Sequence, residues 1–202
     1  VMNNHIGKGG HLSSQPMGAL RDYVAKDPVT EKYAVLNFPV RQDNPYRIDL
    51  EETANLLDRF DPELIILGKS MILHPEPVAA IRKMLETKTS KPVIMYDMAH
   101  VLGLIGPHFQ DPFAEGADII TGSTHKTFYG SQRGVIGAAY EDGTPEFELW
   151  KSIERRVFPG AVSNHHLGTL LGLLMATLEM NAFKETSVPV VIASGQAFAK
   201  TL

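Results

Sequence analysis

Lys126 has the greatest potential for covalent chemistry in this sequence. It lies in a glycine-flanked segment of small and hydroxyl-bearing residues, Thr121–Gly134 (TGSTHKTFYGSQRG). Most lysines in such loops are simply solvated, whereas a lysine that forms a Schiff base needs a free amine in a partly desolvated setting. Ser123 and the loop amides can bind a cofactor phosphate, and His125 and Arg133 add positive charge. The segment is compatible with an exposed lysine or with a reactive amine beside an anion.

Asp97, His100, His11 and Ser70 are further candidates, and each also has an ordinary structural interpretation. Asp97 can cap a following helix, or it can be a carboxylate that keeps a pyridine nitrogen protonated. His100 follows at i+3, and Asp-x-x-His is half of a metal site, but no further ligand stands at recognisable spacing, so no metal is predicted. His11 is either an exposed loop residue or a ring that stacks on a flat cofactor. Ser70 either donates to a cofactor oxygen or is a turn hydroxyl.

Apolar strands that alternate with helices are predicted to position these side chains. Strands are expected at 32–40, 64–68, 92–96, 117–121 and 134–140, and helices at 49–60, 75–85, 147–157 and 165–183. The glycine-rich stretch 3–18 is predicted to be a loop. Strands that are apolar on both faces predict an α/β fold with a mostly parallel sheet covered by helices. Ligands bind beyond the carboxyl ends of such strands, where Ser70, Asp97 and Lys126 all lie.

Composition excludes several other classes of protein. The 202 residues include 19 basic and 23 acidic side chains, so the net charge of -4 predicts no surface for nonspecific nucleic-acid binding. The absence of cysteine excludes disulfides, iron–sulfur clusters and thiolate zinc, and it fits a cytoplasmic location. No apolar run reaches the roughly 20 residues that span a bilayer. The fingerprints of dinucleotide-binding, P-loop and G-x-S-x-G hydrolase sites are missing.

Four segments resemble the serine hydroxymethyltransferase family, in the same order and at similar spacing. They are Gly9–Leu12 (GGHL), Asp97–Ile105 (DMAHVLGLI), Thr124–Thr127 (THKT) and Phe158–Gly160 (FPG). The likeness covers about residues 5–185, and its DMAH and THK segments are the most specific. It implies a pyridoxal-phosphate enzyme of the aspartate-aminotransferase type (fold type I), an α/β protein with a three-layer, mostly parallel mixed sheet.

The resemblance also implies roles for individual positions. Lys126 is similar to the lysine that holds pyridoxal phosphate covalently, and Asp97 to the partner of the pyridine nitrogen. His100 resembles the residue near the phenolic oxygen of the cofactor. His11 resembles the ring that stacks on the cofactor and faces the substrate. Further cofactor contacts are implied for Ser70, His125 and Arg133.

The chain departs from the family pattern in three segments. The Gly-Pro-Arg-Gly-Gly loop becomes 130–135 (GSQRGV), with an extra residue and one glycine fewer. The glycine-rich stretch after Phe-Pro becomes 160–164 (GAVSN), and the second histidine after GGHL is replaced near Ser14. In the family that glycine-rich stretch reaches the cofactor phosphate of the neighbouring subunit, so phosphate binding is expected to differ here.

The resemblance has consequences for domains, activity and partners. Residues 1–185 are expected to be the central portion of the cofactor-binding large domain, and 186–202 the start of a linker helix toward a further C-terminal domain. A β-hydroxy amino acid such as serine is expected to be interconverted with glycine by Cα–Cβ cleavage, in a homodimer or higher oligomer with a shared active site. Tetrahydrofolate is a possible co-substrate.

The sequence leaves three other functions open. They are a folate-independent aldolase or transaldolase, an inactive homologue that serves as a binding subunit, and an aminotransferase or decarboxylase on the same fold. The glutamate, phosphate loop and arginine that would discriminate among them in the family lie outside the matched residues.

Overall fold

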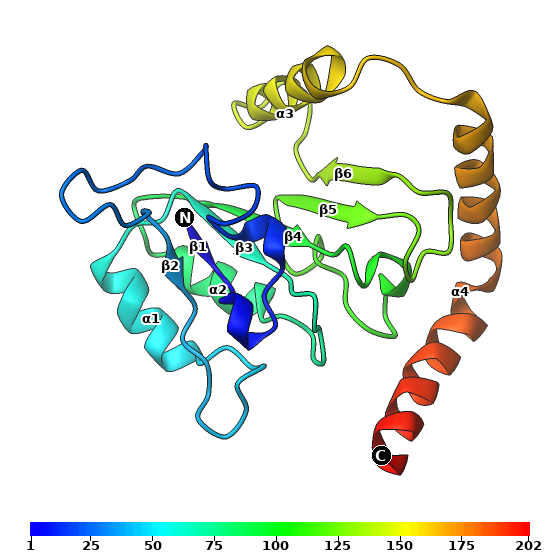
Figure 1. The fold of residues 1–202 in the computed structure, drawn as a ribbon, viewed down its shortest axis with the longest axis horizontal. Helices are drawn as coiled ribbons and strands as arrows, with labels where there is room; N and C mark the ends of the chain where they lie inside the picture. The colour runs from blue at the N-terminus through cyan, green and yellow to red at the C-terminus, as the bar shows by residue number, and fades with distance from the viewer.

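The centre of the molecule is a six-stranded sheet in the order β2-β1-β3-β4-β5-β6 (Figure 1). The computed structural model describes all 202 residues. The strands are β1 (Met2–Asn3), β2 (Leu36–Asn37), β3 (Leu64–Leu67), β4 (Val93–Asp97), β5 (Ile119–Ser123) and β6 (Gly134–Ala138). All neighbours pair in parallel except β5 and β6, which are antiparallel. The predicted α/β class and mostly parallel mixed sheet are confirmed.

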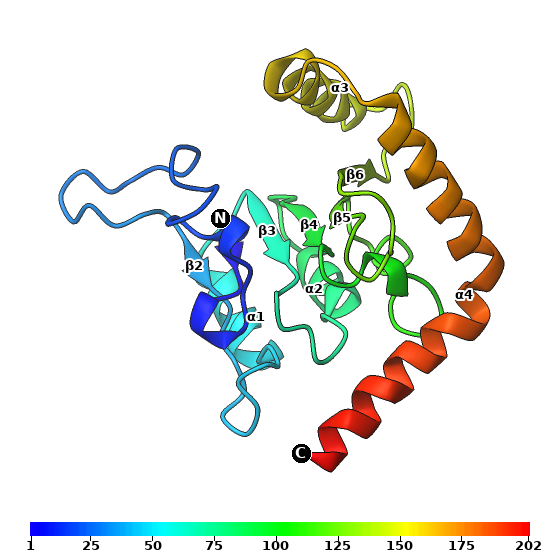
Figure 2. The ribbon, with the colours of Figure 1, turned by 45° about the vertical axis from the view of Figure 1, so that its right-hand side comes forward.

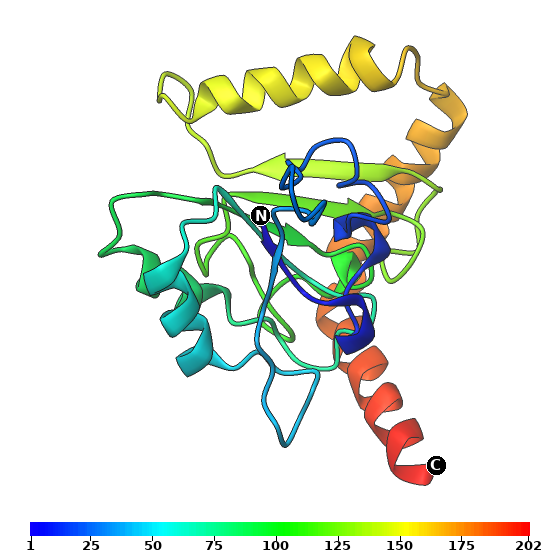
Figure 3. The same cartoon turned by 60° about the vertical axis from the view of Figure 1, so that its left-hand side comes forward.

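Helices and short turns surround this sheet. The helices are α1 (Leu50–Arg59), α2 (Val78–Leu85), α3 (Phe147–Arg155) and α4 (Leu167–Thr201). The turns are η1 (Ile6–Lys8), η2 (Leu12–Ser14), η3 (Leu102–Leu104) and the kinked η4 (Arg156–Ala161). Figures 1 and 3 show α1 and α2 beside the β1–β4 half of the sheet, whereas α3 lies beyond β6. None of the helices combines the length and apolarity needed to cross a membrane.

The main core lies between the sheet and the pair α1–α2. Leu67 pairs with Tyr96, and Tyr96 pairs with Ile120, so these three side chains form one row across the sheet. This row belongs to the same buried cluster as Val78 and Ile81 of α2. Because side chains alternate along a strand, the residue after Tyr96 points to the opposite face. The strand pattern therefore directs Asp97 away from the core, at the end of β4.

The short strands at one edge differ from the sequence prediction. Only Leu36–Asn37 of the expected strand 32–40 pairs with the sheet. Met2–Asn3 forms β1 between β2 and β3, although the region from residue 3 onward was predicted to be a loop. A two-residue strand has no detectable alternation, so its place between β2 and β3 is decided by pairing with these strands rather than by local pattern.

The last helix is longer than predicted. α4 runs without interruption from Leu167 to Thr201, past the expected end at 183. Pro189 lies inside it and has no N–H for the preceding turn, and the helix changes direction about midway in Figure 2. The proposed domain boundary at 185/186 therefore falls within one continuous helix, and the division into domains stays a prediction.

Candidate active site

Four of the predicted site residues lie together at the carboxyl edge of the sheet. Lys126 Nζ is 3.2 Å from His100 Nε2. The rings of His100 and His11 meet edge to face, with their centroids 5.4 Å apart and a 61° angle between the planes. His11 Nδ1 is 3.7 Å from Asp97 Oδ2. An amine, two imidazoles and a carboxylate from three separate segments thus form one continuous series.

Asp97 is held by the turn that follows β4. Its Oδ1 accepts a hydrogen bond from the amide of Ala99 at 3.1 Å, and only 7% of the residue is exposed. Gly68, at the end of β3, has φ of +98°, and a Cβ placed there would be 2.0 Å from the Asp97 carbonyl oxygen. Only glycine satisfies both the dihedral angle and the close approach, so this contact fixes the backbone beneath the carboxylate.

The Lys126 loop is anchored to the His100 turn by hydroxyl groups. Thr127 Oγ1 donates to the carbonyl of His100 at 3.1 Å and accepts from the amide of Gly103 at 3.2 Å. Thr124 and Arg133 exchange hydrogen bonds at 3.0 Å, which closes the base of the loop. Two turns from different strands are therefore coupled, and the Lys126 amine is brought to the His100 ring.

His100 is electrostatically suited to remain neutral. Burial lowers the pKa of His100, and electrostatic interaction with Lys126 and then His11 lowers it further, while Asp97 acts in the opposite direction. A neutral imidazole keeps one ring nitrogen with a free lone pair. His100 Nε2 can therefore accept a hydrogen bond from Lys126 Nζ.

A buried ion pair lies beneath the loop that carries His11. Lys69 and Glu76 are each only 2% exposed, and their charged atoms are 2.7 Å apart. Lys69 Nζ also donates to the carbonyl of Tyr46 at 2.9 Å, and Asn4 Nδ2 donates to the second carboxylate oxygen of Glu76 at 2.9 Å. Because Lys69 pairs with Gly10 through a β-bridge, this network ties the loop after β1 to the end of β3.

Sequence reasoning missed this pair. A lysine directly after a buried strand, with a glutamate seven residues later, was the available signal. That spacing alone does not distinguish two solvated side chains from a buried pair, because the intervening chain has to fold back before the two meet.

The remaining predicted site residues make no hydrogen bond with the four-residue series. Ser70 and His125 are exposed, and Ser123 is partly buried at the end of β5. The Arg133 guanidinium donates to the carbonyl of Gln132 at 2.9 Å and to the hydroxyl of Thr169. No hydrogen bond joins any of these side chains to the series, so their roles as cofactor contacts stay predictions.

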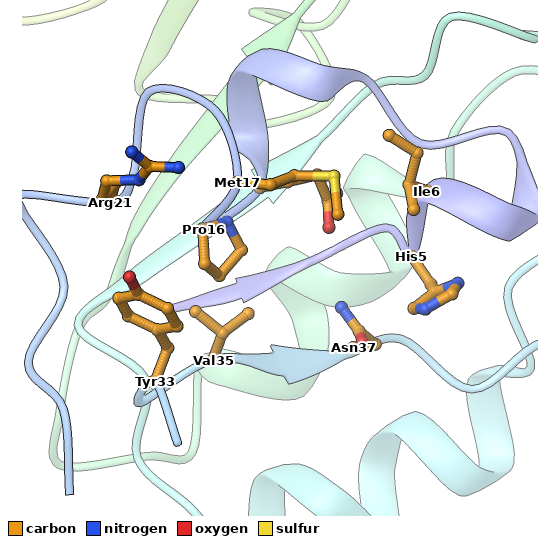
Figure 4. Close-up of a pocket in the computed structure, with 9 residues that line it drawn as sticks. His5, Ile6, Pro16, Met17, Arg21, Tyr33, Val35 and Asn37 are labelled. Atoms are coloured by element: carbon orange, nitrogen blue, oxygen red, sulfur yellow. The ribbon is translucent and has the colours of Figure 1, made fainter. Parts of the chain in front are cut away.

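A separate open pocket lies beside β2 (Figure 4). It is lined by His5, Ile6, Gln15, Pro16, Met17, Arg21, Tyr33, Val35 and Asn37. None of the four series residues lines it. No group of three or more histidine or carboxylate side chains in the structure is placed to hold a metal ion.

The chemistry of the series fits pyridoxal phosphate. The aldehyde of this cofactor requires an amine, and its pyridine nitrogen requires a carboxylate, as supplied by Lys126 and Asp97. His11 places an imidazole ring beside the carboxylate. Together with the mostly parallel mixed sheet, these features define a fold type I pyridoxal-phosphate protein.

Comparisons with known proteins narrow this class to one family. A family model described as serine hydroxymethyltransferase matches residues 1–202. Serine hydroxymethyltransferase from Archaeoglobus fulgidus is 38% identical over 203 residues, which cover 100% of this chain and 42% of that protein. The protein of the same name from Methanosphaera stadtmanae is 37% identical, over 100% of this chain and 44% of its own length. The chain belongs to the serine hydroxymethyltransferase family.

A solved structure is similar as well. An L-threonine transaldolase from Pseudomonas fluorescens superimposes with a TM-score of 0.72 at 28% identity, over 95% of this chain and 39% of that chain. The chain spans less than half the length of the curated relatives described above.

Proposed function

We propose that this protein is a pyridoxal-phosphate-dependent transferase that interconverts a β-hydroxy amino acid such as serine with glycine by cleavage at Cα–Cβ. The observation that carries the proposal is the placement of the Lys126 amine 3.2 Å from His100, within the series that ends at Asp97. Membership of the serine hydroxymethyltransferase family supports the choice of reaction.

Each residue of the series has a separate task in this proposal. When bound, pyridoxal phosphate supplies an aldehyde that condenses with amines and a ring that accepts the electrons of a bond broken at Cα. Lys126 provides the amine for covalent attachment, and His100, kept neutral by burial, accepts a hydrogen bond from this amine and orients it. Asp97 holds a proton on the pyridine nitrogen. His11 packs against the flat ring and orients the substrate.

The covalent role of Lys126 is tested by absorption and labelling. The intact protein is expected to show a visible band with pyridoxal phosphate that borohydride removes, with the reduced label on Lys126 by peptide mapping. Lys126→Ala should lose the label and at least about 10³-fold in kcat, because a covalent group is removed. Lys151→Ala, an exposed lysine of α3, is the control. Full turnover by Lys126→Ala would overturn the covalent role of Lys126 and with it the proposal. No band in the intact protein would overturn the proposal and favour the inactive-homologue alternative.

A second candidate reaction is the folate-independent transfer of glycine to an aldehyde. It is favoured by the likeness to the L-threonine transaldolase and by the changed 160–164 segment. Serine turnover that requires tetrahydrofolate would select the hydroxymethyltransferase, with tetrahydrofolate as co-substrate. Threonine turnover that requires an added aldehyde, and proceeds without folate, would select the transaldolase.

We also propose a homodimer or higher oligomer with a shared active site. Four leucines of α4 recur at helical spacing and form one exposed apolar stripe: Leu167, Leu171, Leu174 and Leu178. Large exposed apolar surfaces of this kind are typical of association surfaces. The cytoplasmic location expected from the cysteine-free composition stays a prediction.

A further inference from the structure

Ser13 lies between two residues of the proposed site, a role that its position in the sequence does not predict. Its Oγ is 2.5 Å from His11 Nδ1 and 3.0 Å from Asp97 Oδ2. The residue belongs to η2, the short turn that begins directly after His11. Its neighbour Ser14 has a different contact, because that hydroxyl donates to the carbonyl oxygen of His11 at 2.9 Å and not to the ring.

The amide and the hydroxyl of Ser13 donate to different residues of the site. The amide of Ser13 donates to His11 Nδ1 at 3.1 Å, and its hydroxyl donates to Asp97 Oδ2 at 3.0 Å. Nδ1 and Oδ2 are themselves 3.7 Å apart. One residue therefore holds both the ring and the carboxylate.

We propose that Ser13 is a positioning residue that couples His11 to Asp97. Through its amide it holds the His11 ring at Nδ1, and its hydroxyl lies 2.5 Å from the same nitrogen. It also fixes the second carboxylate oxygen, while the amide of Ala99 fixes the first. The other charged or titratable groups near the His11 ring are His100, at a centroid distance of 5.4 Å, and Lys126, which contacts His100.

Loss of the hydroxyl has a specific consequence for His11. In Ser13→Ala the backbone amide can still donate to His11 Nδ1, but the hydroxyl that contacts both Nδ1 and Asp97 Oδ2 is gone, so the ring and the carboxylate are no longer held together. Ser13→Thr keeps a hydroxyl at the same position and should preserve the original state. Because Ser13 is exposed, replacement by alanine removes no core packing, and the variant should fold.

Nitrogen NMR of ¹⁵N-histidine-labelled intact protein, without cofactor, tests this link. His11 is assigned by loss of its signals in His11→Gln. We expect the His11 ring nitrogen signals to shift in Ser13→Ala, and to keep the unmodified pattern in Ser13→Thr and in the control Ser14→Ala. Identical His11 signals in Ser13→Ala and the unmodified protein would overturn the proposal, as would an equal change in Ser14→Ala.

The kinetic consequence rests on the proposed function. Ser13→Ala should lower kcat by about ten- to a hundredfold with little change in KM, because a hydrogen bond to a charged group is lost. Ser13→Thr should restore kcat. If pyridoxal phosphate does not attach to Lys126, the proposed function fails, yet the NMR comparison still decides whether Ser13 couples the two side chains.

Discussion

Two regions of the molecule differ in which side chains they bury and which they expose. At the carboxyl edge of β1 and β3, the charged groups of Lys69 and Glu76 are buried and hydrogen-bonded. On α4, which contacts the η3 turn, large apolar side chains such as Leu171 and Leu174 are more than half exposed. Buried charge and exposed apolar surface are the two informative departures from ordinary burial.

The Lys69–Glu76 region is satisfied within this chain, whereas the apolar surface of α4 is left uncovered. The Lys69–Glu76 network satisfies its charged groups within the chain, and it supports the loop that carries His11. The α4 stripe has no such partner within the chain. We therefore expect substitutions at the first region to change stability, and substitutions at the second to change association. Three predictions test this contrast.

The largest effect is expected where a buried charge loses its partner. Lys69→Met leaves Glu76 as an uncompensated buried charge and should lower the free energy of unfolding by about 3–5 kcal/mol. The double variant Lys69→Met with Glu76→Leu should recover most of this loss, because neither charge remains. Urea unfolding of the intact protein measures both.

The matched control is Lys151→Met, which breaks the exposed pair between Lys151 and Glu148. Exposed pairs contribute little, so no measurable change is expected. An effect of Lys151→Met as large as that of Lys69→Met would remove the contrast between the two regions.

An intermediate effect is expected from the pH dependence of His100. Burial and nearby positive charge lower the pKa of His100 in the folded protein, whereas the unfolded chain keeps the ordinary value of about 6.5. Between these values the unfolded state binds more protons, so His100 lowers stability as the pH falls below the unfolded value. Above the unfolded pKa of about 6.5, His100 causes no loss of stability.

This dependence is measured by comparing melting temperatures with those of His100→Gln. Lowering the pH from about 8 to about 5.5 should reduce Tm more in the unmodified protein than in His100→Gln, because only the former carries the shifted histidine. His125→Gln, which replaces an exposed ring, should follow the unmodified protein. Parallel curves for His100→Gln and the unmodified protein would contradict the prediction.

The smallest effect on stability is expected at the α4 stripe. Leu171→Glu adds a charge to an exposed apolar position and should leave the urea midpoint of the separated subunit almost unchanged. It should nevertheless weaken self-association, measured by sedimentation velocity at several concentrations. Lys184→Glu, an exposed charge on another face of α4, is the control and should associate normally. Unchanged association of Leu171→Glu would exclude the stripe as the interface.

Much of the sheet was predictable because its long strands carry their own pattern. Leu64–Leu67 and Val93–Asp97 are apolar runs with clear boundaries, and both were predicted to within a residue. Asp49 also marked the start of α1, since its carboxylate accepts from the amide of Glu52 at 3.1 Å. Apolar runs and helix caps depend on the residue types at neighbouring positions, so the sequence alone predicts them.

The candidate site was predictable in its members but not in its connections. Strand ends and family-like segments singled out Lys126, His100, His11 and Asp97, and the structure brings these four together. The roles of these four residues in the reaction stay proposals. The exposure of Ser70 and His125, by contrast, depends on loop geometry that residue types do not encode.

The sequence by itself thus determined the α/β class, the long strands and the set of reactive side chains, because alternation, capping and residue chemistry act over a few neighbouring positions. Only the tertiary structure decided that Met2–Asn3 is a strand between β2 and β3. It also decided that Lys69 and Glu76 form a buried pair, and that Ser13 contacts both His11 and Asp97. Each of these depends on segments that are distant in the chain, or on hydrogen bonds across a gap that closes only when the sheet has formed.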